Sequence, residues 1–187
     1  MKGKKIVVTG GPGTGKTSLV RSLEDSGFLC FHEVIRSMTS EAKKGGNKEV
    51  MTTNPLAFVN DPYTFNKQLL KERLKHYREA NLLDRPVVFF DRGMPDVLAY
   101  MDYFKQPYQN DFIEPCKRNR YDRVLMLPPW KDIYVKDNER LENYEEAMAI
   151  HRILESKYRL FGYTPVEVPT GTVQERLDFV KNAILSS

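Results

Sequence analysis

Eight residues near the N-terminus, Gly10 to Thr17, match the phosphate-binding pattern G-x-x-x-x-G-K-[ST] in full. Glycines at these positions let backbone N–H groups turn inward around a phosphate, and a following helix adds the positive end of its dipole. Lys16 is expected to reach the β- and γ-phosphates of a nucleotide, and the Thr17 hydroxyl to bind Mg²⁺. The nucleotide-binding residues predicted from this pattern are Gly11, Pro12, Gly13, Thr14, Gly15, Lys16, Thr17 and Ser18.

An aspartate–arginine pair, Asp91-Arg92, follows the apolar run 86–90. In an open α/β sheet, ligands bind beyond the carboxyl ends of the strands, so this pair is expected to face the same crevice as the phosphate-binding loop. Asp91 is predicted to hold Mg²⁺ or its water shell. Arg92 is predicted to hold an anionic group of an acceptor or to steady a transferred phosphoryl group. The alternative is that Asp91 only caps the next turn.

A second acid, Glu33, follows the apolar run 28–31, and Arg36 lies one helical turn later. Glu33 can accept a proton from an acceptor hydroxyl or ligate Mg²⁺ through water, and Arg36 can bind an acceptor phosphate or carboxylate. A plain acid at a helix start, favoured by the helix dipole and accompanied by a solvated arginine, remains the alternative.

Two further segments are candidates for contact with a nucleotide. Arg140 follows the polar stretch 130–138, and a flap of about 130–140 that carries this arginine would close over a triphosphate; the alternative is a solvated residue at a helix start. The loop that contains Pro169 and Gly171 can clasp a base through backbone groups, or be a plain connection. Since no N-K-x-D guanine motif follows an apolar strand, ATP is favoured over GTP.

The elements that must position these residues alternate along the chain. Apolar strands are predicted over 6–9, 28–31, 86–90, 123–127 and 166–168, and helices over 17–24, 34–44, 62–83, 95–103, 111–119, 139–161 and 173–185. Alternating strands and helices indicate an α/β fold with a parallel sheet covered on both faces. Residues 45–60 are rich in loop formers and are expected to be a mobile connection. No linker divides the sequence, so one domain is predicted over 1–187.

The composition narrows the class of protein. The 187 residues are 41% hydrophobic and 29% charged, which is typical of a folded globular chain, and the net charge of +4 is too small to predict nucleic-acid binding. Cys30 and Cys116 form no CxxC or metal spacing. No apolar stretch approaches the length of a membrane span or a signal peptide, so we expect a cytoplasmic protein. The oligomeric state cannot be predicted from these features.

Two longer stretches resemble a known family. The segments 90–100, which reads FDRGMPDVLAY, and 166–180, with its VEVP start and VQERLDFV end, are similar to small predicted ATPases grouped with the nicotinamide-riboside-kinase domain of bacterial NAD regulators. The resemblance covers nearly the whole chain. It implies a three-layer P-loop NTPase fold with strand order 2-3-1-4-5, ATP and Mg²⁺, and a cleft faced by Glu33, Arg36, Asp91, Arg92 and Arg140. The chain departs from deoxynucleoside kinases after Glu33, where it lacks their proline or aromatic residue.

Two functions follow from these residues as hypotheses. The first is phosphoryl transfer from ATP to a small hydroxyl-bearing, nucleoside-like acceptor, with Lys16, Glu33, Asp91, Arg92 and Arg140 as the catalytic residues. The second is an ATPase or a nucleotide-gated binding module that has no small-molecule acceptor. A GTPase-like switch is disfavoured because the guanine motif is missing.

Overall fold

The structure of the chain is a computed structural model that describes residues 3–35, 61–131 and 143–185. Five strands form one parallel sheet in the order β2-β3-β1-β4-β5. The strands are β1 (Lys4–Gly10), β2 (Leu29–Phe31), β3 (Val87–Asp91), β4 (Arg123–Leu127) and β5 (Val166–Glu167). The predicted α/β fold class and strand order are therefore confirmed.

The central strand β1 sets the geometry of the sheet. Its residues Ile6, Val7 and Val8 are at most 1% exposed, as expected for a strand covered on both faces. Strands β3 and β4 flank it, with Val8 opposite Asp91 in one ladder and Gly10 opposite Leu127 in the other. This register brings the carboxyl ends of three strands to one edge of the sheet, where the sequence places its candidate site residues.

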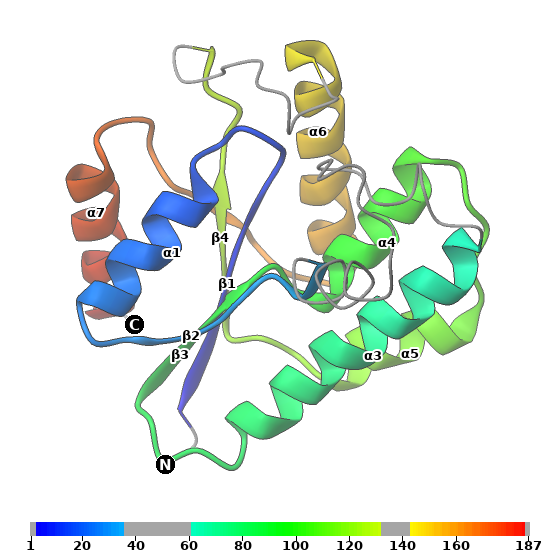
Figure 1. Cartoon of the computed structure of the whole chain (residues 1–187), viewed down its shortest axis with the longest axis horizontal. Coiled ribbons are helices and arrows are strands. Elements are labelled where there is room, and N and C mark those ends of the chain that lie inside the picture. The colour runs from blue at the N-terminus through cyan, green and yellow to red at the C-terminus, as the bar shows by residue number, and fades with distance from the viewer. Residues whose placement is uncertain (1–2, 36–60, 132–142, 186–187) are drawn as a thin grey trace, which may run out of the picture.

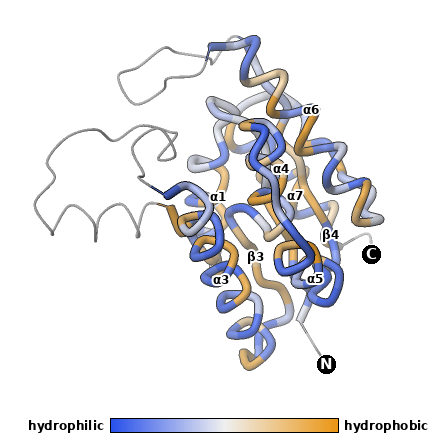
Figure 2. Tube along the Cα trace, turned by 90° about the vertical axis from the view of Figure 1, so that its right-hand side faces the viewer, coloured by the Kyte–Doolittle hydropathy of each residue, from blue (hydrophilic) through white to orange (hydrophobic). Residues whose placement is uncertain are grey.

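Helices cover both faces of the sheet (Figure 1). Helices α1 and α7 lie together on one face, and α3, α4, α5 and α6 lie on the other. The helices are α1 (Lys16–Asp25), α3 (Pro62–Ala80), α4 (Met94–Tyr103), α5 (Asn110–Arg118), α6 (Tyr144–Leu160) and α7 (Val173–Leu185). Figure 2 shows hydrophobic strand segments between helices of mixed hydropathy, the pattern expected of a three-layer fold.

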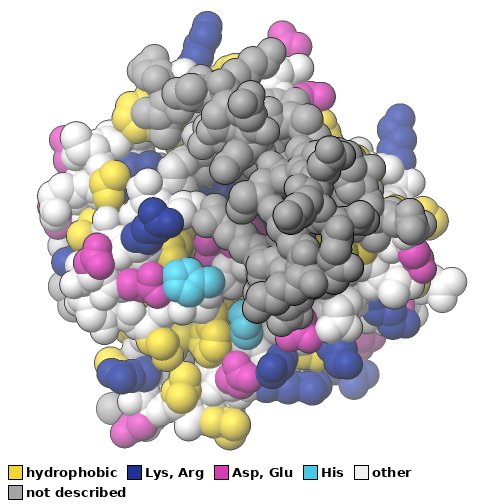
Figure 3. All heavy atoms as spheres, viewed as in Figure 1, with side chains coloured by type: hydrophobic (Ala, Val, Ile, Leu, Met, Phe, Trp, Pro, Cys, Tyr) yellow, Lys and Arg dark blue, Asp and Glu magenta, His cyan; other side chains and the backbone are white. Residues whose placement is uncertain are grey.

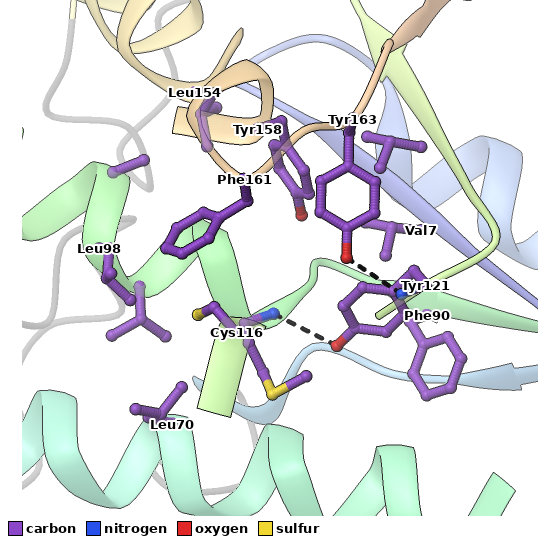
Figure 4. Packing of buried hydrophobic residues seen from close by; sticks show 14 of the residues in the cluster. Val7, Leu70, Phe90, Leu98, Cys116, Tyr121, Leu154, Tyr158, Phe161 and Tyr163 are labelled. Atoms are coloured by element: carbon purple, nitrogen blue, oxygen red, sulfur yellow. Dashed lines mark hydrogen bonds between the residues drawn. The ribbon is translucent and has the colours of Figure 1, made fainter. Parts of the chain in front are cut away.

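The larger of the two cores is rich in tyrosine (Figure 4). Tyr121 and Tyr158 are at most 4% exposed, and Tyr163 packs edge-on against Tyr158 at 5.6 Å between ring centroids. The Tyr163 hydroxyl accepts a hydrogen bond from the Tyr121 backbone N–H at 3.0 Å, and the Tyr121 hydroxyl accepts one from the Met94 N–H at 3.3 Å. Because these hydroxyls are hydrogen-bonded, the cost of burying them is offset where the rings fill the space between α4, α6 and the sheet.

Two helix boundaries differ from the prediction by more than one residue. Helix α6 begins at Tyr144 rather than near 139, because Asn143 is extended and forms a capping box with Glu146. Helix α3 ends at Ala80 rather than at 83. Of the helix predicted over 34–44, the structure describes only residues 34–35, which are helical.

The described surface carries charges of both signs. On the face shown in Figure 3, Lys and Arg side chains are interspersed with Asp and Glu in the part that is described. Among the described residues, no helix has both the length and the apolar character that crossing a membrane requires.

Truncating Phe89 tests the packing of the sheet. Its ring is fully buried and lies edge-on to Phe28 at 5.3 Å between centroids. We expect Phe89→Ala to lower the free energy of unfolding by about 3–5 kcal/mol, because it leaves a cavity in the core. Leu82 is 86% exposed, so Leu82→Ala is the matched control and should stay within about 0.5 kcal/mol of the parent in urea unfolding. Equal losses in the two variants would contradict this core.

Candidate functional site

The phosphate-binding loop connects the end of β1 to the start of α1. Three of its glycines have positive φ angles: 152° at Gly10, 71° at Gly13 and 78° at Gly15. Side-chain-bearing residues rarely adopt these conformations, and a Cβ atom on Gly10 would also lie only 2.6 Å from the Leu127 carbonyl oxygen. The glycines of the motif are therefore required by the backbone shape of this loop.

The N-terminus of α1 lacks the side-chain caps found on three of the other described helices. Its N-cap, Gly15, offers no side-chain hydrogen bond, and the first turn contains no acid. By contrast, α3, α6 and α7 are capped by the side chains of Asp61, Asn143 and Thr172. A helix that starts at a glycine N-cap and has no acid in its first turn leaves the positive end of its dipole uncompensated by these groups, which fits a helix end that receives the phosphates of a ligand.

Lys16, at the start of α1, is a buried lysine whose charged form is disfavoured in the ligand-free protein. Its Nζ donates a hydrogen bond to the Gly11 carbonyl oxygen at 3.0 Å. Burial and the nearby charge of Arg92 lower the pKa of Lys16 to about 7, although three neighbouring carboxylates oppose this shift. An anion placed in the loop would stabilise the charged ammonium. The electrostatics of the site thus favour a negatively charged ligand beside Lys16.

Two arginines hold Glu33 at the end of β2. The Glu33 side chain is 13% exposed; its Oε1 accepts from Arg73 Nη2 at 2.9 Å, and its Oε2 forms an ion pair with Arg92 Nε. Arg73 lies on α3 with a side chain only 4% exposed, and its Nη1 donates to the Gly93 carbonyl oxygen at 2.8 Å. Glu33 is thus fixed between α3 and the turn that follows β3.

Arg92 contacts several parts of the site through its backbone and its side chain. Its backbone φ is 75°, an unusual conformation for a residue other than glycine, and its N–H donates to the Val8 carbonyl oxygen at 3.0 Å. Its Nη1 donates to the Gly10 carbonyl oxygen at 3.3 Å and to Asp96 Oδ1 at 3.2 Å. The guanidinium carbon also lies 5.1 Å from the ring centroid of Tyr100. Arg92 therefore joins the phosphate-binding loop to the acids around it.

Asp91 and Thr17 supply oxygen ligands of the kind that Mg²⁺ prefers. Asp91 ends β3, and its charge is one of those that act on Lys16. Thr17 lies in the first turn of α1. Among the described residues, no group of three or more His, Cys, Asp or Glu side chains could hold a metal by itself. Mg²⁺ at nucleotide sites is held by one or two protein oxygens together with phosphates and water, so these two residues fit that ion.

The C-terminal helix is attached to the phosphate-binding loop. Arg176 of α7, which is 4% exposed, donates from Nη2 to the Thr14 carbonyl oxygen at 2.8 Å. The connection from β5 to α7 contains Pro169, which is exposed, and Gly171, which is partly buried. The contact of Arg176 with the loop places this connection on the phosphate-binding side of the sheet.

Two of the predicted site residues lie outside the described residues. These are Arg36 and Arg140, together with the segment 45–60 and all of the predicted flap beyond residue 131. Their roles stay predictions. The structure brings together the other charged candidates, because Asp91, Glu33 and Arg92 all act electrostatically on Lys16.

Sequence reasoning missed three buried charged residues: Arg73, Asp96 and Arg176. Arg73 stands three residues after the buried Leu70, so a cation at a core position of a helix was one available signal. Asp96 stands three residues after the N-cap Gly93, where an acid is typical of a capping box. Arg176 gave no comparable signal.

The strand order and the glycine loop between β1 and α1 together define a P-loop NTPase of the nucleotide-kinase type. A family model described as AAA domain matches residues 5–176, and the chain belongs to that family. The resemblance inferred from the sequence is thereby confirmed at the level of the P-loop fold. A search of curated proteins finds no match.

Solved structures with similar folds include three that act on or bind nucleosides or nucleotides by name. Deoxyadenosine kinase from M. mycoides is 17% identical, with a TM-score of 0.63, over 98% of this chain and 100% of that one. NadR protein in complex with NR is 22% identical, with a TM-score of 0.69, over 99% of this chain and 50% of that one. Thymidylate kinase from Candida albicans is 15% identical, with a TM-score of 0.68, over 99% of this chain and 92% of that one. These likenesses show the fold.

The lowered pKa of Lys16 predicts that nucleotide affinity depends on pH. Bound phosphates favour the charged ammonium, so above pH 7 binding must take up a proton. The dissociation constant of ATP should therefore rise about tenfold per pH unit above about pH 7, until the pKa of Lys16 in the complex is reached. Isothermal titration in buffers of different ionisation enthalpy measures this proton uptake.

The Lys16→Arg variant is the control, because its guanidinium stays charged throughout the range. The affinity of Lys16→Arg for ATP should change less with pH than that of the wild type, whatever its absolute value. A wild-type affinity that does not change between pH 7 and pH 9 would contradict the lowered pKa.

Proposed function

We propose that the protein transfers the γ-phosphoryl group of ATP, with Mg²⁺, to a hydroxyl group of a small nucleoside-like metabolite. One observation carries this proposal. The acid after β2, Glu33, is paired with Arg92 after β3, and Arg92 contacts Gly10 at the entry to the phosphate-binding loop. An acid and an arginine thus adjoin the loop in which a terminal phosphate would lie.

The phosphate-binding residues supply binding and charge. Backbone N–H groups of the loop 11–18 would surround the phosphates, and Lys16 would leave the Gly11 carbonyl oxygen to meet the β- and γ-phosphates. Thr17 and Asp91 would hold Mg²⁺, which neutralises charge on the phosphates when bound. Pro169 and Gly171 would contact the base, and Arg140 would add positive charge from the flap.

Glu33 would act as the general base. A proton passes from the acceptor hydroxyl to a Glu33 oxygen as the new O–P bond forms, and the bond from the γ-phosphorus to its bridging oxygen breaks to release ADP. For this step one of the two arginine contacts of Glu33 must open. When Glu33 turns from Arg92 to the acceptor, Arg73 still holds the carboxylate, and the Arg92 Nε–H becomes available to the transferring phosphoryl group.

The fold supports an acceptor of this class. Deoxyadenosine kinase and thymidylate kinase share the architecture, and NadR protein was solved with NR bound in a structure of the same fold. Arg36 would contact the acceptor as well. At these identities the neighbours name a class of acceptor, so the compound itself has to be found by experiment.

A second function has one observation in its favour. Both oxygens of Glu33 are engaged by arginines, as in a purely structural ion-pair cluster. If that cluster never opens, the protein is an ATPase or a nucleotide-gated binding module, and water or a partner protein takes the place of the acceptor.

Removal of the Lys16 ammonium tests nucleotide use under either function. We expect Lys16→Ala to reduce ATP turnover by about 10²-fold or more, because the terminal phosphates lose their main cationic partner. Lys75→Ala is the control, since Lys75 lies on the exposed surface of α3, where its Nζ is 3.9 Å from Glu79 Oε1. If Lys16→Ala turns over ATP as fast as the control, both proposed functions are ruled out.

Neutralisation of Glu33 separates the two functions. Nucleosides and other hydroxyl-bearing metabolites are first screened for ATP-dependent phosphorylation by mass spectrometry. For an acceptor that is found, Glu33→Gln should keep ATP affinity but lose about 10²–10⁴-fold in transfer rate, because the base is gone. Glu24→Gln, on the surface beside His32, is the control. Undiminished transfer by Glu33→Gln would rule out this residue as the base, and turnover stimulated only by a protein partner would favour the second function.

A further inference from the structure

Asp96 is a fully buried carboxylate with four hydrogen-bond donors. Its Oδ1 accepts from the Thr9 hydroxyl and, at 3.2 Å, from Arg92 Nη1. Its Oδ2 accepts from the Gly93 N–H at 2.9 Å and from the Tyr158 hydroxyl. The four donors satisfy both oxygens, so the carboxylate occupies one fixed orientation.

These donors come from the elements that build the site. Thr9 precedes the phosphate-binding loop on β1, Arg92 and Gly93 form the turn after β3, and Tyr158 lies on α6. The approach of α6 is close, since a Cβ atom on Gly93 would lie 2.5 Å from the Tyr158 hydroxyl oxygen. Figure 4 shows Tyr158 reaching from α6 into the buried cluster. Asp96 therefore ties three separate segments together at a single point.

The carboxylate of Asp96 is charged at neutral pH. Burial alone would raise the pKa of Asp96, but the charges of Arg92 and Arg73 and the hydrogen bonds from Thr9 and Tyr158 outweigh it and lower that pKa below its usual value. Arg92 consequently has two anionic partners, Glu33 and Asp96, on different sides of its guanidinium.

Helix capping accounts for only part of this arrangement. Asp96 caps α4 through the Gly93 N–H, which uses Oδ2. The corresponding acids of α6 and α7, Glu146 and Glu175, perform the same task in exposed or partly exposed positions. The second oxygen of Asp96 faces Thr9 and Arg92, and neither contact contributes to the cap.

We propose that Asp96 is a positioning residue for phosphoryl transfer, which holds the Arg92 guanidinium between the phosphate-binding loop and Glu33. This inference rests on the proposed function. Arg92 has a left-handed backbone and reaches both Gly10 and Glu33, so a small rotation of its side chain would change the separation between phosphate and acid. When Glu33 turns to the acceptor, Asp96 is the anion that keeps Arg92 in place.

The Asp96→Asn variant tests this role with two readouts. In the wild type, the buried and paired Arg92 Nε–H should give a slowly exchanging signal in ¹H–¹⁵N NMR of the ligand-free protein, and in Asp96→Asn this signal should be lost or shifted. The release of ADP from ATP and Mg²⁺, with a defined mixture of ribonucleosides as acceptors, should fall about 10- to 100-fold in kcat. The dissociation constant of ATP should change less than about threefold, since the loop and Lys16 remain.

Asp102→Asn is the matched control. Asp102 lies on the same helix and pairs with the largely buried Lys157, away from the phosphate-binding loop. Loss of the Asp102–Lys157 ion pair should lower the thermal stability, yet leave the Arg92 NMR signal and ADP release as in the wild type.

The outcomes separate this proposal from the proposed function. An unchanged Arg92 signal in Asp96→Asn overturns the positioning role whether or not the protein is a kinase. A lost signal with undiminished ADP release overturns the link to the reaction. If the wild type releases no ADP, the proposed function fails, and the NMR signal still decides whether Asp96 positions Arg92.

A second variant covers the case in which Asp96→Asn does not fold. The double variant Asp96→Asn/Arg92→Gln removes both charges of the pair, so neither residue keeps a buried charge without its partner. If Asp96 acts through Arg92, the double variant should lose no more ADP release than Arg92→Gln alone. A further tenfold loss in the double variant would show that Asp96 acts by another route and would overturn the proposal.

Discussion

The site depends on the buried guanidinium of Arg92. A charged group can be buried only if its charge and its donors are compensated, and here Glu33 and Asp96 provide the charge while the Gly10 carbonyl oxygen accepts a further hydrogen bond. Its backbone N–H donates to the Val8 carbonyl oxygen of the central strand. Contacts of one residue thereby join three strand ends, and these contacts restrain the unusual φ of Arg92.

The charges of the site explain why an anionic ligand belongs beside Lys16. Arg73 and Arg92 are matched by Glu33 and Asp96, which leaves this group of four neutral in total. Burial and the charge of Arg92 lower the pKa of Lys16 to about 7 and outweigh Asp91, Glu33 and Asp96, which raise it. A phosphate in the loop would restore the charged ammonium. Because Arg92, Glu33 and Asp96 also act on Lys16, nucleotide binding and the arginine–carboxylate cluster are electrostatically coupled.

Local sequence patterns predicted the sheet and the phosphate-binding loop, but not the side-chain contacts between distant residues. The apolar runs and the glycine motif each consist of residues close together in sequence, so the strands, the strand ends and the loop could be predicted. The partners of Glu33 could not, because Arg73 comes from a helix whose face is fixed only by packing. The start of α6 was predicted wrongly although its signal was local: Asn143 and Glu146 form a capping box, with Asn143 in an extended conformation at the N-cap.

Stability and function meet at Asp96. The same carboxylate caps α4, receives the Tyr158 hydroxyl from the tyrosine-rich core, and pairs with Arg92. Gly93 belongs to this unit as well, since no larger residue leaves room for Tyr158. The sequence Asp91-Arg92-Gly93 and the acid three residues later therefore act as one structural unit, in which each residue is constrained by contacts with another. Packing changes in α6 should consequently reach the phosphate-binding edge through this carboxylate, even though α6 itself lies across the core from β3.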